Sequence, residues 1–381
     1  GKTMTVSELR EKLNEFPQDM HIIGQEAVLF HKDSTLQLLD ILMPGKGFKV
    51  ELHNSSTAGD LGDCVAMLAT LQHKGDQHMV YLRDNGMTAG IERRIDIIRP
   101  LLEAQPYIES VQIWRRQNIQ WDSAGFRPNW HTGTQNLAEC HARHALDTKF
   151  IPTLPDFSKP WLTVEADKKW EGRVDVHRSA RYRSEYFPWH AVVHHYDSKL
   201  VFLGMPEEHQ DFCSQFGNIE YHPTKDLLEA ARIIKGSSIL IGNQSSLMVI
   251  AEGLKHPRIQ ETCLWIPDCI YPGATNAQYC ANGDAILPDV DGSGVLDFKR
   301  DLLPEANTQN VPRGGWQYPG LPNGMSHLDL QVKNLRKMAS HLSPQEARDM
   351  IIRHNIQRLP RFFDSRGVDS RFSRFRLAMQ N

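Results

Sequence analysis

The stretch Ile239-Leu-Ile-Gly-Asn-Gln-Ser-Ser-Leu-Met-Val-Ile-Ala-Glu-Gly-Leu254 decides the fold of this 381-residue chain. Its first three residues are a continuous apolar run, which predicts a buried strand of a parallel sheet. Its second half carries apolar residues at helical spacing, namely Leu247, Met248, Ile250, Ala251 and Leu254. The small polar residues 242–246 lie between these two runs. The stretch therefore predicts a strand, a tight turn and a helix.

The predicted turn has two interpretations. The first N–H groups of a helix are unpaired and the helix dipole is positive there, so the turn suits a phosphate or diphosphate. An ordinary strand-to-helix turn that is capped by Asn243 or Ser245 explains the same residues. Both interpretations place the beginning of the helix directly after the turn.

Short apolar strands and helices alternate on both sides of this stretch. Strands are predicted at 48–52, 79–82, 110–114, 173–176, 199–203, 219–221 and 259–265, and helices at 64–71, 95–102, 188–195, 207–216 and 224–235. This alternation is typical of parallel sheets with helices on both faces. The Pro-rich residues 152–160 separate two series of similar size. Residues 118–144 are less regular, and their Trp and His residues either line an acceptor cleft or pack at the surface.

Charge and composition limit the possible partners. The chain has 43 Lys and Arg against 46 Asp and Glu, a formal charge of −3, which argues against bulk binding of polyanions. Residues 331–381 are the exception, with 11 Lys and Arg against 4 Asp and Glu. After Arg358 these basic residues alternate with Phe, a pattern that fits either nucleic-acid binding or a helix anchored by its aromatic rings.

The cellular environment is predicted from cysteine usage and hydropathy. Six cysteines are scattered without a C-x-x-C pair, which predicts reduced and mostly buried thiols. No apolar run approaches the roughly 18 residues of a membrane span, and the start lacks the apolar core of a signal peptide. The expectation is a soluble cytoplasmic protein, or one of the host cytoplasm if a phage encodes it.

Two segments together resemble a known family. Residues 226–257 resemble the donor-domain signature of two-Rossmann (GT-B) glycosyltransferases, and are closest to the ADP-heptose heptosyltransferase-like (GT9-like) group. In that group a helix, a strand, an Asp-Ser-Gly-type turn and an Ala-rich helix ending before Gly-x-Pro occur in this order. Residues 54–63, Asn-Ser-Ser-Thr-Ala-Gly-Asp-Leu-Gly-Asp, resemble the family's Ser-x-Gly-Asp loop after its first strand. The resemblance covers residues 48–288.

The resemblance implies an α/β fold in which two Rossmann-like domains face a central cleft. We expect an N-terminal appendage at 1–46, an acceptor domain at 47–155, a donor domain at 156–330, and a basic helical tail at 331–381 that packs back on the first domain. The implied reaction is inverting transfer of a sugar from a nucleotide-sugar donor to an acceptor hydroxyl, without a metal or another cofactor. The acceptor is a saccharide or a hydroxyl-bearing DNA base, as in phage DNA glycosyltransferases.

The resemblance also implies roles for individual residues. Asp60 is the expected general base and Asp63 the fallback, although Asp60 also fits an ordinary helix N-cap. The acceptor is expected to contact the same turn, at Ser56, Thr57 and Gly59. The remaining candidates are assigned to the donor: Arg178, Ser179, Arg181, Arg183, Asn243, Gln244, Ser245 and Ser246 to its phosphates, Glu252 to its ribose, and Thr224, with His222, to its base.

Two departures from the family pattern affect the choice of donor. Asn243 stands where the family has an acid, and Met248 where it has a phosphate-facing His. A heptose donor is therefore doubtful, while the backbone amides still suit a phosphate. Two alternatives stay open: a catalytically silent nucleotide-binding or interaction module of the same fold, and a UDP-sugar epimerase.

Two further motifs are set aside. Residues 289–294, Asp-Val-Asp-Gly-Ser-Gly, begin like a calcium loop, but Arg300 occupies the position that requires Glu, so a turn is predicted. The pairs His141/His144 and His194/His195 lack further metal ligands nearby in the sequence.

Overall fold

The computed structural model describes residues 52–84, 90–126, 136–263, 269–271, 274, 276–281, 283–300 and 327–358. The predicted appendage at 1–46 and the basic aromatic residues after Arg358 lie outside the described residues.

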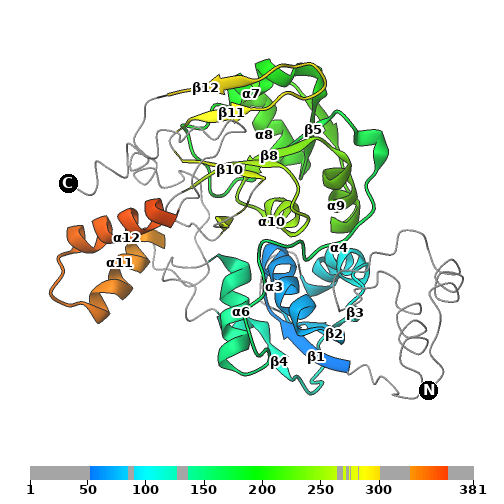
Figure 1. The fold of residues 1–381 in the computed structure, drawn as a ribbon, viewed down its shortest axis with the longest axis vertical. Coiled ribbons are helices and arrows are strands. Elements are labelled where there is room, and N and C mark those ends of the chain that lie inside the picture. The colour runs from blue at the N-terminus through cyan, green and yellow to red at the C-terminus, as the bar shows by residue number, and fades with distance from the viewer. Residues whose placement is uncertain are drawn as a thin grey trace, which may run out of the picture.

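The first half of the chain forms a four-stranded parallel sheet in the order β3-β2-β1-β4. Its strands are β1 (Leu52–Thr57), β2 (Gln77–Leu82), β3 (Ile108–Ile113) and β4 (Trp121–Asp122). Its helices are α3 (Leu61–Lys74), α4 (Ile91–Glu103) and α6 (Leu137–Asp147), and a short 3-10 turn, η1, covers Ser123–Phe126. This half lies at the bottom of Figure 1.

Two predictions for this half differ from the structure. The strand predicted at 48–52 lies outside the described residues except for Leu52, and β1 continues from Leu52 through the hydroxyl residues that resembled a loop. These side chains are small, and the last three residues of β1 are buried between β2 and β4. The irregular segment 118–144 contains α6, whose buried face consists mainly of small residues, Ala138, Cys140, Ala142 and Ala145.

The second half forms a six-stranded parallel sheet in the order β10-β9-β8-β5-β6-β7. Its strands are β5 (Val174–His177), β6 (Leu200–Leu203), β7 (Glu220–His222), β8 (Ile239–Asn243), β9 (Arg258–Glu261) and β10 (Ala277–Cys280). Its helices are α7 (Trp189–Tyr196), α8 (Pro206–Phe216), α9 (Leu227–Gly236) and α10 (Ser246–Gly253). Numbered along the chain from β5, the strands have the Rossmann order 3-2-1-4-5-6.

Three smaller elements complete this half. The 3-10 turns η2 (Lys168–Trp170) and η3 (Asp197–Lys199) precede β5 and β6. The strands β11 (Ala285–Leu287) and β12 (Leu296–Phe298) form an antiparallel pair. The predicted turn at 289–294 lies between them and is closed by Asp289, which accepts a hydrogen bond from the Gly294 N–H at 3.0 Å.

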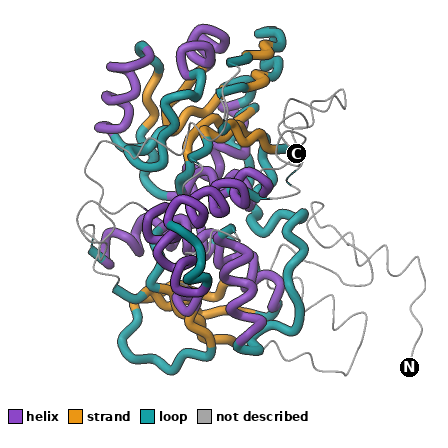
Figure 2. The backbone as a smooth tube through the Cα atoms, turned by 90° about the vertical axis from the view of Figure 1, so that its left-hand side faces the viewer, coloured by secondary structure: helices purple, strands orange, loops and turns teal. Residues whose placement is uncertain are grey.

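Helix α10 joins the two halves. Most of its residues are apolar and buried, because it packs on β8 and β9 of its own sheet, on α9, and on α3 of the first half. The contact with α3 is close at Gly62, where an added Cβ would lie 3.7 Å from the Ser246 Cα. Figure 2 shows helices in the middle of the molecule with strands above and below them.

Trp161 lies in the segment that connects the two sheets, and it forms hydrogen bonds with both α10 and α3. Its N–H donates to the Gly253 carbonyl at 2.9 Å, and its indole Nε1 donates to the Val65 carbonyl of α3 at 3.2 Å. The Trp161 carbonyl accepts a 2.5 Å hydrogen bond from the Tyr107 hydroxyl. A single buried residue therefore ties α10, through its main chain, to α3, through its side chain.

Helices α11 (His327–Met338) and α12 (Pro344–Arg358) form a hairpin at the side of the molecule (Figure 1). Residues Val332, Leu335 and Ile351 pack with Ile270, Tyr279 and Ala281 of the second half. The described part of the tail therefore packs on the second half, and not on the first as predicted. No helix in the described ranges is long and apolar enough to cross a membrane.

The six cysteines are free, and all except Cys213 are buried. Burial raises the pKa of the Cys64 thiol to about 12. A thiol in this state has little thiolate at neutral pH, so Cys64 serves in packing.

Asp175 of β5 makes the folding stability depend on pH. The residue is fully buried, and burial raises the pKa of its carboxyl group to about 7, against the opposing effects of Ser237 and Arg173. Because the folded state holds this proton more tightly than the unfolded state, stability falls as pH rises from the ordinary carboxyl range through about 7.

We expect urea unfolding to show this loss, by up to about 3 kcal/mol between pH 5 and pH 8 at about 1.4 kcal/mol per unit. Asp175→Asn removes the titrating group and should flatten the difference. Equal pH slopes in the two proteins would contradict the assignment.

Candidate active site

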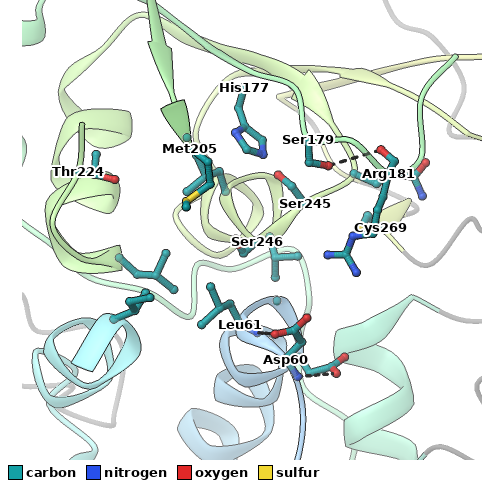
Figure 3. A pocket seen from close by; sticks show the side chains of 18 of the residues that line it. Asp60, Leu61, His177, Ser179, Arg181, Met205, Thr224, Ser245, Ser246 and Cys269 are labelled. Carbon is teal, nitrogen blue, oxygen red and sulfur yellow. Dashed lines mark hydrogen bonds between the residues drawn. The ribbon is translucent and has the colours of Figure 1, made fainter. Parts of the chain in front are cut away.

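A cavity of about 910 Å3 opens between the two halves. Its walls come from the beginning of α3, from α4, and from the segments that follow β5, β6, β7 and β8. The volume lies within the range of small-molecule sites in proteins. Figure 3 shows Ser179, Arg181 and Ser245 on one side of the cavity and Asp60 and Leu61 on the other.

The second sheet places the cavity at its topological switch point. The chain leaves β5 toward β6 and β7 on one side, and later returns to β8 on the other side of β5. In open α/β sheets, ligands bind outside the carboxyl ends of the strands at such a point. Ser179 follows β5, while Ser245 and Ser246 follow β8, and all three line the cavity.

Asn243 connects the loops that follow β5 and β8. Its Oδ1 accepts from the Ser179 N–H at 2.9 Å, and its Nδ2 donates to the Ser179 carbonyl at 3.1 Å and to the Arg181 carbonyl. Gln244 lines the cavity, although its Oε1 is also occupied, because it accepts from the Cys263 N–H at 2.7 Å. Both side chains are buried. The predicted phosphate contact by the Asn243 side chain does not fit, because it is used within the protein and lies outside the cavity lining.

Ser245 presents its hydroxyl to the cavity. It is the N-cap of α10, but its side chain makes no capping hydrogen bond. Its Oγ is buried and has no hydrogen-bond partner in the structure. Together with the unpaired first N–H groups of α10, this hydroxyl is available to a ligand.

Asp60 lies on the opposite wall and also caps α3. Its Oδ1 accepts from the Leu61 N–H at 3.1 Å, and its own N–H donates to the Asp63 Oδ2 at 3.1 Å. Asp60 and Asp63 therefore form a capping box and both line the cavity. Gly59 has to be glycine, since an added Cβ would lie 2.3 Å from the Asp63 Cβ. The capping interpretation holds, and it leaves Asp60 at the cavity wall.

The predicted acceptor residues lie behind this turn. Ser56 and Thr57 are fully buried in β1, where the Ser56 hydroxyl donates to the Asp122 Oδ1 at 3.1 Å and the Thr57 Oγ1 accepts from the Gly59 N–H at 3.0 Å. Neither residue, nor Gly59, lines the cavity. Direct contact with an acceptor does not fit these positions. The Thr57 hydroxyl holds the turn, and the Ser56 hydroxyl ties β1 to β4.

Only one of the three predicted phosphate-binding arginines lines the cavity. Arg178 is 4% exposed and forms a two-point ion pair with Glu261, at 2.9 and 3.0 Å. Arg183 pairs with Asp211 at 2.7 Å and donates to the Ser179 carbonyl at 2.8 Å. Their predicted phosphate contacts do not fit these positions. The guanidinium of Arg181 extends into the space between the two walls (Figure 3).

Glu252 does not reach the cavity. It is 1% exposed at the far end of α10, where it pairs with Arg258 and Lys255. The Arg258 guanidinium also donates to the Tyr279 hydroxyl at 3.0 Å. This buried network does not fit the predicted ribose contact.

Of the two residues assigned to the nucleoside base, only one lies at the cavity. Thr224 lines the cavity, whereas His222 lies outside the lining with its Nε2 3.7 Å from a Glu229 carboxylate oxygen.

Sequence reasoning missed several residues in the cavity wall. They are His177 at the end of β5, Glu208 of α8, Lys225 before α9, and Arg93 and Asp96 of α4. A signal for His177 existed, because the last residue of a strand beside the switch point borders the ligand crevice. The predicted strand ended one residue earlier, at 176. Arg93 and Asp96 gave no signal, because exposed charges on an amphipathic helix are ordinary.

Comparison with known proteins gives matches among solved structures. No family model and no curated protein matches the chain. The E. coli heptosyltransferase WaaC with ADP-2-deoxy-2-fluoro heptose matches at 12% identity and a TM-score of 0.44, over 61% of this chain and 94% of that one. The family 9 glycosyl transferase of Veillonella parvula DSM 2008 matches at 12% and 0.36, over 55% and 80%. The chain resembles heptosyltransferase-like GT-B enzymes.

A third match corrects the prediction about metals. Dodecameric TibC, in complex with ADP-D-beta-D-heptose, matches at 14% identity and a TM-score of 0.38, over 80% of this chain and 77% of that one. TibC is described as iron-containing, and this contradicts the expectation that no metal takes part. In the described part of this chain, no three His, Cys, Asp or Glu side chains lie together as a possible metal site.

Proposed function

We propose that this protein is an inverting glycosyltransferase that uses a nucleotide-sugar donor and an acceptor hydroxyl. One observation carries the proposal: the Asp60 carboxylate and the amide-rich beginning of α10 line the same cavity from different halves of the chain. The predicted GT-B arrangement, with an acceptor domain at 47–155 and a donor domain at 156–330, is part of this proposal.

The two walls supply complementary chemistry. The donor diphosphate binds at the first N–H groups of α10, with the Ser245 hydroxyl and the Arg181 guanidinium as further donors. These groups stabilise the negative charge that grows on the leaving diphosphate. The acceptor oxygen forms its bond to the anomeric carbon while the bond from that carbon to the phosphate oxygen breaks. Asp60 takes the acceptor proton as general base, and a single displacement inverts the anomeric centre.

A thermal-shift panel of nucleoside diphosphates tests donor binding. A ligand at 100 times its Kd stabilises the folded state by about 2.7 kcal/mol, which corresponds to a rise in Tm of roughly 3 °C. We expect this rise with at least one nucleoside diphosphate, a smaller rise with the matching nucleoside, and a reduced rise in Arg181→Gln. The exposed Arg115→Gln is the matched control. Equal shifts with diphosphate and nucleoside would contradict a phosphate site.

Turnover assays separate the proposal from its alternatives. Transfer to a saccharide, or to DNA with a hydroxymethylated base, supports the transferase and identifies its acceptor. Tight binding of a nucleotide sugar without any turnover would indicate the silent module. Interconversion of UDP-sugars in the absence of an acceptor would indicate the epimerase.

A further inference from the structure

His177 is a buried ring at the wall of the cavity that the reaction described above does not use. It is 7% exposed, it is the last residue of β5, and it pairs with Gly242 of β8 at the switch point of the sheet. Figure 3 shows the ring facing the cavity beside Met205 and above Ser245. An added Cβ at Gly242 would lie 2.5 Å from the His177 carbonyl, so the two strand ends leave no room for a larger residue there.

One ring nitrogen of His177 is already committed. Its Nδ1 lies 2.8 Å from the Leu203 carbonyl, which only accepts hydrogen bonds, so Nδ1 carries the proton. In the neutral ring Nε2 is then an acceptor, and it becomes a donor only in the imidazolium form. Within the described chain Nε2 has no hydrogen-bond partner, and the residue lines the cavity.

The groups opposite the ring attract an anion. Ser245 follows Gly242 by three residues, and its buried Oγ is unpartnered. The first N–H groups of α10 point to the same space, since α10 begins at Ser246. His177 and Ser245 both line the cavity at the carboxyl ends of the neighbouring strands β5 and β8. A phosphate at the start of α10 would therefore lie beside both side chains.

We propose that His177 binds the donor diphosphate as an imidazolium, donating from Nε2 to a phosphate oxygen opposite the Ser245 hydroxyl. This proposal rests on the proposed function. It adds that binding of the donor depends on the protonation of His177. Because only the protonated ring donates at Nε2, binding of the donor is coupled to uptake of a proton by His177.

Several charged residues line the cavity together with His177. Glu208 of α8 lies on the same side of the ring as Gly204, since its Oε2 and the His177 Nδ1 both approach the position of a Cβ at Gly204, at 2.8 and 3.0 Å. The other charged residues of the cavity lining are Asp60, Asp63, Arg93, Asp96, Arg181, Lys225 and Asp226. Carboxylate, ammonium and guanidinium groups ordinarily change charge outside pH 6 to 8.5, whereas an imidazole changes charge within it.

Calorimetric titration across pH 6 to 8.5 tests the linkage. The probes are UDP-glucose and ADP-glucose, whose diphosphate diester gains or loses no proton in this range. In the native protein we expect Kd to rise with pH across this range, by at most tenfold per pH unit, because only the protonated ring donates from Nε2. His177→Gln keeps a neutral donor but loses the charge, so its Kd should vary by less than twofold with pH and be about tenfold weaker at pH 6.

Two further variants make the result specific. His194→Gln removes an exposed histidine of α7 and should keep the native pH dependence. Ser245→Ala should weaken binding at every pH and leave its slope unchanged. Affinity that is indifferent to pH in the native protein, or a pH slope that survives in His177→Gln, overturns the role of His177 while leaving donor binding intact. Absence of binding to both probes at every pH overturns the proposed function together with this inference.

Discussion

Replacing Asp60 by asparagine should lower kcat for sugar transfer by about 10²- to 10⁴-fold, the usual contribution of a positioned general base. The carboxylate lines the cavity opposite the beginning of α10, and asparagine cannot accept the acceptor proton. The measurement is steady-state transfer with the donor that the thermal-shift panel identifies. Kd for the nucleoside diphosphate should change little, because Asp60 lies on the other wall.

The choice of asparagine separates catalysis from capping. Asp60 is the N-cap of α3, and asparagine caps a helix about as well as aspartate, so Tm should stay nearly constant. Asp60→Ala loses both functions and should cost about 1 kcal/mol of stability in addition. Asp63→Asn changes the other carboxylate of the same capping box, so its rate of transfer is compared with that of Asp60→Asn. If Asp60→Asn transfers sugar at a nearly unaltered rate, Asp60 is not the base.

Replacing Arg178 by methionine should lower the free energy of unfolding by about 3–5 kcal/mol, a fall in Tm of roughly 5 °C. The change leaves the Glu261 carboxylate buried and without its ion-pair partner, although that carboxylate still accepts from the Ser184 N–H at 2.6 Å and the Trp189 indole at 2.9 Å. The loss is large because a buried charge without its counterion carries its full desolvation cost. Urea unfolding measures it.

Two comparisons identify the cause of this loss. Arg178→Met combined with Glu261→Gln removes both charges and should recover part of the stability. Arg183→Gln breaks a partly exposed pair with Asp211 and should cost at most about 1 kcal/mol. A weaker affinity for nucleoside diphosphates with unchanged stability in Arg178→Met would instead restore the phosphate role that the sequence suggested.

The local elements of the fold were largely predictable. The strand, turn and helix at 239–254 appear as β8 and α10, with bounds that agree within a few residues. The prediction succeeded because a buried parallel strand and a buried helix both require apolar runs, and these differ in length and periodicity. It failed at β1 and α6, where small and polar residues are buried between neighbouring elements and leave no apolar signal.

The site was predictable in its two turns and not in its individual side chains. Asp60, Asp63, Ser179, Ser245 and Ser246 lie at the cavity because each follows a parallel strand at its carboxyl end, a position that the order of elements along the chain defines. Arg178 also follows a parallel strand at its carboxyl end, and yet it is buried in an ion pair, as is Glu252 at the far end of α10. Their partners Glu261 and Arg258 are in β9, and nothing in the local sequence around Arg178 indicates Glu261.

The sequence by itself determined the α/β alternation, the helix start that suits a phosphate, and the carboxylate at the first turn, because periodicity, capping and turn chemistry act over a few residues. Only the tertiary structure decided which charged side chains face the cavity and which are paired with each other inside the protein. That choice depends on strand order and on the packing of α3 against α10, which bring together residues far apart in the chain. His177 shows the difference: its position at the end of β5 is local, whereas its fixed Nδ1 depends on the neighbouring strand β6.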